Sequence, residues 1–318
     1  MAQQAVEGAA RAQWASVFRE DLFEGQAGLV TGGGTGIGFA IAFELLTLGA
    51  DVLITSRNED RLAEAAATLR KAFPERKVEY FVCNIRDDKE VAAMITNVLE
   101  RFGRLNFVVN CAGGQYPAPA SAITNNGFRT VVDLNLNGTF AVCREAFDQY
   151  MFDHGGNIVN IIATYHNGFP MMAHTGAARA AVANLTETLA LEWAAYGVRV
   201  NSVAPGNIYS ESSKLHYRTK GNFLGDDPIA AAAPFIPCKR IGSTQEVSGL
   251  VCFLLSPAAS YVTGVTARID GGATLMSNAS YVLCDVDNYP KYGELPPEED
   301  TRAVFEAAAQ AKLLESKL

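Results

Sequence analysis

The stretch TGGGTGIG, residues 31–38, decides the fold of this chain. It follows the apolar run GLV at 28–30 and leads directly into FAIAFELLTLGA at 39–50, a segment with helical period. A glycine-rich turn between a strand and a helix bends the backbone sharply and leaves unpaired N–H groups at the positive end of the helix. The spacing of Gly32, Gly36 and Gly38 therefore predicts a turn that binds the pyrophosphate of a dinucleotide.

Outward from this turn, short β-branched runs alternate with longer helical segments from about Gly25 to Gly272. The expected strands after the first are DVLITS (51–56), VEYFVCN (78–84), LNFVVN (105–110), NIVNII (157–162) and VRVNSVA (198–204), and further helices are expected over 59–73, 89–102 and 178–193. Strict alternation predicts parallel strands joined by crossover helices, and almost wholly apolar strands belong in a sheet covered on both faces. The fold expected is a single α/β domain, a doubly wound Rossmann-type parallel sheet with helices on both faces.

Two segments flank this domain, which we place at residues 25–272. Residues 1–24 form an N-terminal appendage, and residues 273–318 form a C-terminal extension. The chain closes on Ser316-Lys317-Leu318, a tripeptide that a peroxisomal import receptor binds. We therefore expect the matrix of a peroxisome or glycosome, the alternative being a chance ending of a charged helix.

Composition excludes several classes of protein. The 318 residues carry a net charge of −8 without a run of Lys or Arg, which argues against nucleic acid as the main partner. No run of about 18 apolar residues offers a membrane span. The six cysteines are scattered, without a Cys-x-x-Cys pair or a histidine at ligand spacing, so we expect buried free thiols and no metal site.

The end of the second expected strand indicates which dinucleotide is bound. An acidic residue about 20 positions after the last glycine would hold a ribose 2′-hydroxyl group and select NAD. Arg57 stands there instead, and its guanidinium group would pair with a 2′-phosphate. The sequence therefore favours NADP(H), the alternative being a solvated arginine at a helix start.

Further motifs fall at the ends of other strands. They are Asn110-Cys111-Ala112-Gly113, Asn135 within LNLNGTF, Pro205-Gly206 and Asp270-Gly271-Gly272. Together with the Gly-x-x-x-Gly-x-Gly turn, they resemble the short-chain dehydrogenase/reductases over roughly 250 residues.

The resemblance implies a set of cofactor contacts. Gly32, Gly36, Ile37 and Gly38 would line the pyrophosphate, Asn84 and Ile85 would flank the adenine, and the segment from Asn110 through Ala112 to Gly113 would back the ribose. Asn135 would support the catalytic relay. The other cofactor contacts expected are Thr35, Asn58, Arg179, Pro205, Gly206 and Ile208.

The chain departs from this family at its catalytic motif, Tyr-x-x-x-Lys. Arg179 stands at the lysine position and Thr175, one helical turn earlier, stands at the tyrosine position. The family's serine falls at Ile162-Ala163. The same departure is typical of enoyl-CoA and dienoyl-CoA reductases. The segments GGQYPAPA, HTGAARAAV and CKRIG are most similar to those of peroxisomal trans-2-enoyl-CoA reductases, and after these to those of 2,4-dienoyl-CoA reductases.

The chemistry of a conjugated thioester is consistent with this loss. Hydride addition to the β-carbon places negative charge on the thioester oxygen, so the site needs a hydrogen-bond donor more than a strong acid. Tyr165, which matches the displaced tyrosine of dienoyl-CoA reductases, or Thr175 would donate that bond, while Arg179 would hold the nicotinamide ribose. The alternatives are a solvent-facing Tyr165 and a Thr175 that caps the next helix; His166 and His174 are expected at the surface.

The sequence thus predicts NADPH-dependent reduction of the trans-2 double bond of enoyl-CoA thioesters. The alternatives are a 2,4-dienoyl-CoA reductase, a carbonyl reductase or alcohol dehydrogenase, and an inactive NADP-binding subunit. Within the insertion 207–237, the cations Lys214, His216, Arg218 and Lys220 suit the phosphates of coenzyme A, the alternative being a solvated loop. By fold analogy, the helices expected near 127–150 and 175–196 predict a homotetramer.

Overall fold

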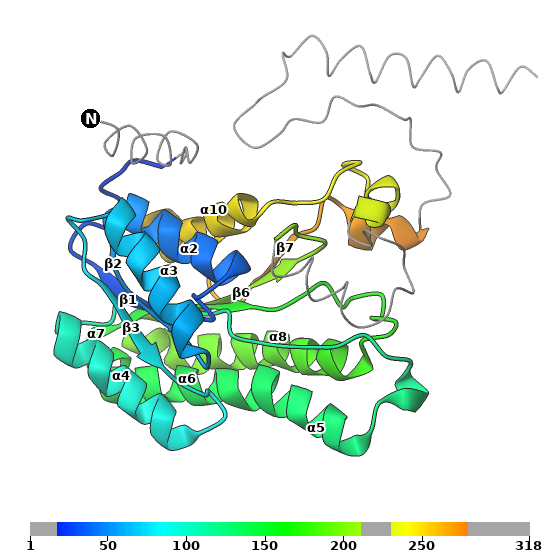
Figure 1. Cartoon of the computed structure of the whole chain (residues 1–318), viewed down its shortest axis with the longest axis horizontal. Helices are drawn as coiled ribbons and strands as arrows, with labels where there is room; N and C mark the ends of the chain where they lie inside the picture. The colour runs from blue at the N-terminus through cyan, green and yellow to red at the C-terminus, as the bar shows by residue number, and fades with distance from the viewer. Residues whose placement is uncertain (1–17, 211–229, 279–318) are drawn as a thin grey trace, which may run out of the picture.

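A computed structural model describes residues 18–210 and 230–278 (Figure 1). Seven strands form one wholly parallel sheet in the order β3-β2-β1-β4-β5-β6-β7. The strands are β1 (Ala27–Thr31), β2 (Asp51–Ser56), β3 (Val78–Val82), β4 (Phe107–Asn110), β5 (Gly156–Ile161), β6 (Val198–Pro205) and β7 (Thr266–Ile269). The sequence did not indicate β7, because this edge strand has four residues and none of them is fully buried.

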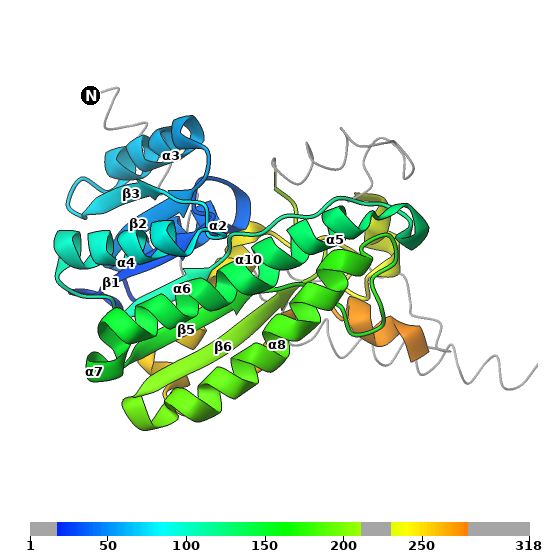
Figure 2. The ribbon, with the colours of Figure 1, turned by 90° about the horizontal axis from the view of Figure 1, so that it is seen from below.

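Helices cover both faces of the sheet, which confirms the doubly wound prediction. On one face lie α2 (Gly36–Thr47), α3 (Glu59–Ala72) and α10 (Thr244–Leu255); on the other lie α4 (Asp88–Phe102), α6 (Gly138–Ala146) and α8 (Ala173–Trp193) (Figures 1 and 2). The shorter elements are η1 (Ala120–Ala122), α5 (Asn125–Val132), η2 (Asp133–Asn137), η3 (Phe147–Met151), α7 (Phe152–His154), η4 (Ala194–Tyr196), η5 (Ala230–Phe235), η6 (Pro257–Ala259) and η7 (Ala273–Asn278).

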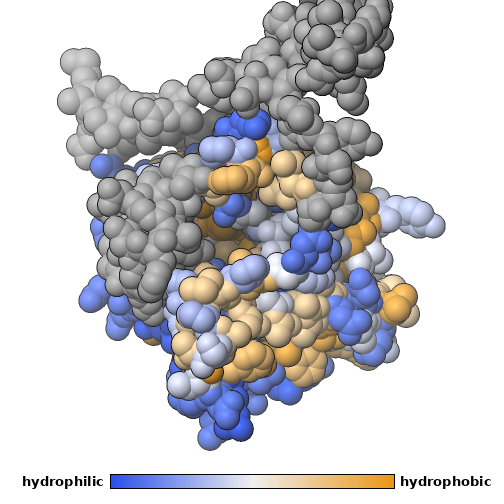
Figure 3. Space-filling view, turned by 90° about the vertical axis from the view of Figure 1, so that its right-hand side faces the viewer, coloured by the Kyte–Doolittle hydropathy of each residue, from blue (hydrophilic) through white to orange (hydrophobic). Residues whose placement is uncertain are grey.

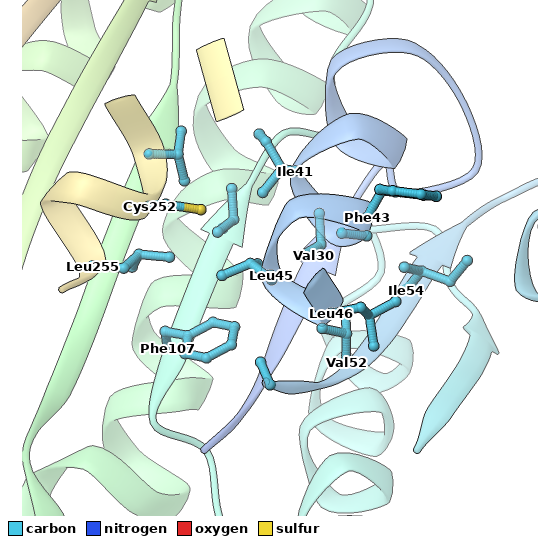
Figure 4. Close-up of a cluster of buried hydrophobic side chains, with 14 of the residues drawn as sticks. Val30, Ile41, Phe43, Leu45, Leu46, Val52, Ile54, Phe107, Cys252 and Leu255 are labelled. Carbon is cyan, nitrogen blue, oxygen red and sulfur yellow. The ribbon is translucent and has the colours of Figure 1, made fainter. Parts of the chain in front are cut away.

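Each face of the sheet has its own hydrophobic core. On the α2 and α10 side, Ile41 and Leu45 pack over Val30 and Phe107 of the sheet, with Leu255 beside them (Figure 4). A second buried cluster lies under α4, α6 and α8. All four residues of β4 are buried, as expected for a central strand covered on both faces.

Buried polar side chains join the central strands beneath the carboxyl edge. The Asn110 amide donates to Asn160 at 2.9 Å, and the Asn160 amide donates to Thr186 of α8 at 2.9 Å. Thr186 and Ser202 of β6 share a hydrogen bond of 2.6 Å. Because unsatisfied polar groups are costly in an interior, this chain of bonds fixes how β4, β5, β6 and α8 sit relative to one another.

The remaining structural expectations have mixed outcomes. The five cysteines within the described residues are free, and three of them are buried as expected. The burial expectation is wrong for Cys111 and Cys238, which are partly exposed, and Cys284 lies outside the described residues. No helix in the described part of the chain is long and apolar enough to cross a membrane. The expected coenzyme A cluster at 214–220 and the tripeptide Ser316–Leu318 lie outside the described residues.

Candidate active site

The glycine turn forms a backbone cradle between β1 and α2. Gly32 and Gly36 have φ angles of +70° and +57°, and a Cβ atom at Gly38 would overlap the Gly32 carbonyl oxygen. Thr35 precedes α2, but its side chain does not cap the helix, so the first N–H groups of α2 have no side-chain acceptor from it. Backbone donors and the positive end of the helix dipole suit an anionic group.

Thr31 fixes this turn against the end of β4. Its hydroxyl oxygen accepts hydrogen bonds from the N–H groups of Cys111 and Ala112, both at 3.0 Å. The N–H group of Gly32 donates to the Thr55 carbonyl oxygen at 2.7 Å. The strand order reverses direction between β1 and β4. Folds of this type bind ligands in a crevice at such a reversal, at the carboxyl edge of the sheet.

Arg179 points from α8 into this crevice. It is 8% exposed, and its Nη1 atom donates to the Ile161 carbonyl oxygen at 2.6 Å. Its Nε atom has no hydrogen-bond partner among the described residues. Burial lowers the pKa of Arg179 to about 10, so the group is still a cation at neutral pH. A buried cation without a carboxylate is costly unless a ligand compensates it.

Asn135 holds the loop that faces Arg179. It is fully buried in a π-helical turn, and its amide nitrogen donates to the carbonyl oxygens of Gly114 and Val131 at 2.8 Å each. A Cβ atom at Gly113 would overlap Arg179 and lie 2.6 Å from the Asn135 oxygen. The structure thus brings the expected residues Gly113, Asn135 and Arg179 into contact.

Thr175 is fully buried in the first turn of α8, and its hydroxyl group donates to the Gln115 side-chain oxygen at 3.1 Å. The helix begins at Ala173 after Met172, so the expectation that Thr175 caps the helix is wrong. The cap fails because the chain becomes helical earlier than the sequence HTG suggests. The surface expectation for His174 is also wrong, since the side chain is fully buried against Tyr116, whereas His166 is exposed as expected.

Tyr165 lies just beyond β5 and is partly buried. Its ring stacks on His166 with centroids 4.4 Å apart and packs against the small cluster of Ile162, Val182, Ala183 and Ala204. Its hydroxyl group is bound to none of the described residues. Tyr165 is therefore not a fully solvated loop side chain, and its hydroxyl donor has no partner in the described part of the chain.

The expected adenine end lies at the tips of β2 and β3. Arg57 is exposed, and Asn58 caps α3 by accepting the N–H group of Arg61 at 2.9 Å. Ile85 is buried against Gly138, while the Asn84 N–H group donates to Glu90 at 2.7 Å. The exposed guanidinium group of Arg57 is thus available to a phosphate at this edge.

Four further expected contacts lie at the ends of β4 and β6. The buried Asn110 side chain donates to Asn160 within the sheet, so it is not offered to a ligand at the carboxyl edge. At the other end, Pro205 accepts the N–H group of Thr164 at 3.2 Å, Gly206 passes close to Asp270, and Ile208 is buried against Gly242. The surface is hollowed at this end of the molecule, with apolar residues beside the hollow (Figure 3).

Comparison with known proteins places the chain in a family. A family model described as enoyl-(acyl carrier protein) reductase matches residues 32–274, most of the described domain. The chain belongs to the short-chain dehydrogenase/reductase family. This membership confirms the resemblance drawn from the glycine turn and makes the protein an oxidoreductase that uses a nicotinamide cofactor.

Several relatives within the family are named as reductases of unsaturated acyl-CoA. A peroxisomal 2,4-dienoyl-CoA reductase from Danio rerio is 38% identical over 83% of this chain and 87% of its own length. A probable 2,4-dienoyl-CoA reductase from Bacillus subtilis is 36% identical over 79% of this chain and 98% of its own. Among solved structures, a citronellol catabolism dehydrogenase from Pseudomonas aeruginosa is 41% identical, with a TM-score of 0.72 over 82% of this chain and all of that one.

Sequence reasoning missed two residues that this reductase fold places in the site. Gln115 accepts the Thr175 hydroxyl group, and His174 contacts both the Thr175 backbone and Tyr116. Both lie inside the segments GGQYPAPA and HTGAARAAV, which carried the similarity to enoyl-CoA reductases. The pairing itself joins positions 60 residues apart, so no local pattern discloses it.

Proposed function

We propose that this protein reduces the carbon–carbon double bond of trans-2-enoyl-CoA thioesters with NADPH. The observation that carries the proposal is the pair on α8, where Thr175 and a buried Arg179 replace the tyrosine and lysine of ketone reductases. An arginine in place of the lysine does not supply a proton readily, and a threonine hydroxyl is a poor acid. Such a pair suits a reaction in which hydrogen bonding stabilises charge on oxygen and the α-carbon then takes its proton from water.

The residues present fit a bound dinucleotide. The glycine cradle and the N–H groups at the start of α2 would hold its pyrophosphate, and Arg179, with its unpartnered Nε atom, would hold the nicotinamide ribose. When bound, the nicotinamide supplies the hydride. Asn135 keeps the Gly113–Gly114 backbone against Arg179, so the cofactor side of the crevice is preorganised.

Negative charge then accumulates on the thioester oxygen of the substrate. A hydroxyl donor from Thr175 or Tyr165 would stabilise that charge, with Gln115 orienting the Thr175 hydroxyl group through the bond at 3.1 Å. The fixed positive charge of Arg179 would add to the stabilisation without itself losing a proton.

A second candidate is the reduction of 2,4-dienoyl-CoA, which the names of the curated relatives favour. Tyr165 also supports it, because this residue matches the displaced tyrosine of those enzymes and its hydroxyl group is bound to none of the residues that the structure describes. The extended conjugation would place negative charge on the same thioester oxygen, so one donor arrangement serves both substrates.

A spectroscopic assay of NADPH oxidation with a medium-chain trans-2-enoyl-CoA, the matching 2,4-dienoyl-CoA and a simple ketone tests the proposal. We expect turnover on the enoyl thioester and none on the ketone; preference for the dienoyl thioester would favour the second candidate. The variants Thr175→Val and Tyr165→Phe identify which hydroxyl group is the donor. The variant that removes the oxyanion donor is expected to lower kcat about 10²-fold. Unchanged turnover in both variants would contradict the donor assignment, and an inactive wild type that still binds NADPH would indicate an inactive subunit.

The choice of NADPH over NADH rests on Arg57. Replacing it with leucine is expected to raise KM for NADPH about tenfold while leaving KM for NADH within twofold, since only the 2′-phosphate pairs with the guanidinium group. Arg61→Leu, on the exposed start of α3, is the matched control. Steady-state kinetics with both dinucleotides measure this, and equal losses for the two would refute the assignment.

The proposal extends to where the protein is located and how it assembles. The peroxisomal names of several relatives and the terminal Ser316-Lys317-Leu318 support import into a peroxisome or glycosome by its receptor. Exposed apolar side chains on α5 and α6, Phe128 at 38% and Phe140 at 40%, support a homotetramer built on these helices.

A further inference from the structure

His174 is a fully buried histidine at the start of α8. Its Nδ1 atom accepts a hydrogen bond from the backbone N–H group of Thr175 at 2.8 Å. The first N–H groups of a helix lack partners within the helix, so this bond satisfies one of them from a side chain. Only a neutral ring offers an acceptor nitrogen, and burial lowers the pKa of His174, which favours that form.

The same ring contacts the loop that follows β4. Its edge packs against Tyr116 with centroids 4.6 Å apart and an interplanar angle of 77°. Tyr116 directly follows Gln115, the residue that accepts the Thr175 hydroxyl group. The His174 ring therefore contacts both segments that the Thr175–Gln115 hydrogen bond joins, the start of α8 and the loop after β4.

The position of Tyr116 is itself fixed by α5. A Cβ atom at Gly127 would overlap the Tyr116 hydroxyl group, so the ring occupies space that only glycine leaves free. The helices α5 and α8 lie side by side (Figure 2), and Tyr116 contacts the first turn of each, at Gly127 of α5 and at His174 of α8. The loop carrying Gln115 is thus held from two sides.

We propose that His174 is a positioning residue that sets the Thr175 hydroxyl group for the reaction by clamping the first turn of α8 to the Gln115–Tyr116 loop. The inference rests on the proposed reductase function. His174 acts through Thr175 and Gln115. The glycine cradle and Arg57, which are expected to bind NADPH, lie on other segments, so a change at His174 should leave NADPH binding intact.

Three variants of the full chain test this role. His174→Leu, which removes the acceptor, is expected to lower kcat about tenfold and to leave the dissociation constant for NADPH within twofold. His174→Asn, which keeps an acceptor near the Nδ1 position, is expected to recover most of the loss. His154→Leu, an exposed histidine on α7, is the matched control. In a Thr175→Val background, His174→Leu is expected to add less than a twofold loss, because the two changes remove one arrangement.

Multiplied losses in the double variant, or a loss of NADPH affinity equal to the loss of kcat, would overturn the inference. A second readout does not depend on turnover. Hydrogen exchange of the peptide containing Thr175, followed by mass spectrometry, is expected to quicken about tenfold in His174→Leu and to stay near the wild-type rate in His174→Asn. Unchanged exchange in His174→Leu would overturn the clamp, whereas inactivity of the wild type on every thioester would refute the proposed function alone.

Discussion

Replacing Arg179 with methionine is expected to reduce kcat/KM by at least 100-fold, a loss of about 2.7 kcal/mol of transition-state stabilisation. The same change is expected to leave the melting temperature unchanged or higher. The guanidinium group is buried, holds one backbone carbonyl at 2.6 Å, and has an Nε atom without a partner among the described residues. Its desolvation is a cost to the free protein that an apolar side chain of similar length does not carry.

Thermal unfolding and steady-state kinetics, measured with and without NADPH, separate the two effects. At one fixed concentration of NADPH, the stabilisation of the variant should be smaller than that of the wild type, because ligand stabilisation falls as the dissociation constant rises. Arg179→Lys keeps the charge and is expected to recover part of the affinity, while the exposed Arg101→Met on α4 is the control. Full activity in Arg179→Met would show that this cation does not serve the reaction.

Gly38→Ala is expected to remove NADPH binding, raising its dissociation constant more than about 100-fold, and to lower the free energy of unfolding by about 3 kcal/mol. The added methyl group would overlap the Gly32 carbonyl oxygen and lie 3.2 Å from the Gly33 Cα atom. Both neighbours are backbone atoms of the same turn, so relief requires the cradle itself to open. Urea unfolding and fluorescence titration with NADPH measure the two losses.

Gly34→Ala is a matched control in the same turn. The nearest atom to an added Cβ there is the Ser56 hydroxyl oxygen at 3.6 Å, an ordinary contact. We expect stability and NADPH affinity close to those of the wild type. Equal damage in both variants would mean that any side chain in the turn is harmful, against the specific role of Gly38.

Most of the fold could be predicted from short-range patterns, although the bounds of α10 and the edge strand β7 could not. Apolar runs separated by helical segments specified six of the strands, because a buried parallel strand needs apolar residues on both faces and a crossover helix must follow it. The edge strand β7 was missed, since its partly buried residues TARI resemble a loop. The spacing of Gly32, Gly36 and Gly38 likewise specified the cradle, whose geometry depends on local backbone angles.

The sequence by itself determined which groups meet on one helix, and the tertiary structure decided what those groups touch. Thr175 and Arg179 share a face of α8 because the helical period puts them one turn apart. Packing of separate segments determined that Thr175 binds Gln115, that His174 is buried, and that Arg179 lacks a carboxylate partner among the described residues. Helical and strand periodicity depends on residues a few positions apart, whereas these partners meet only when segments that lie far apart in the chain pack together around the sheet.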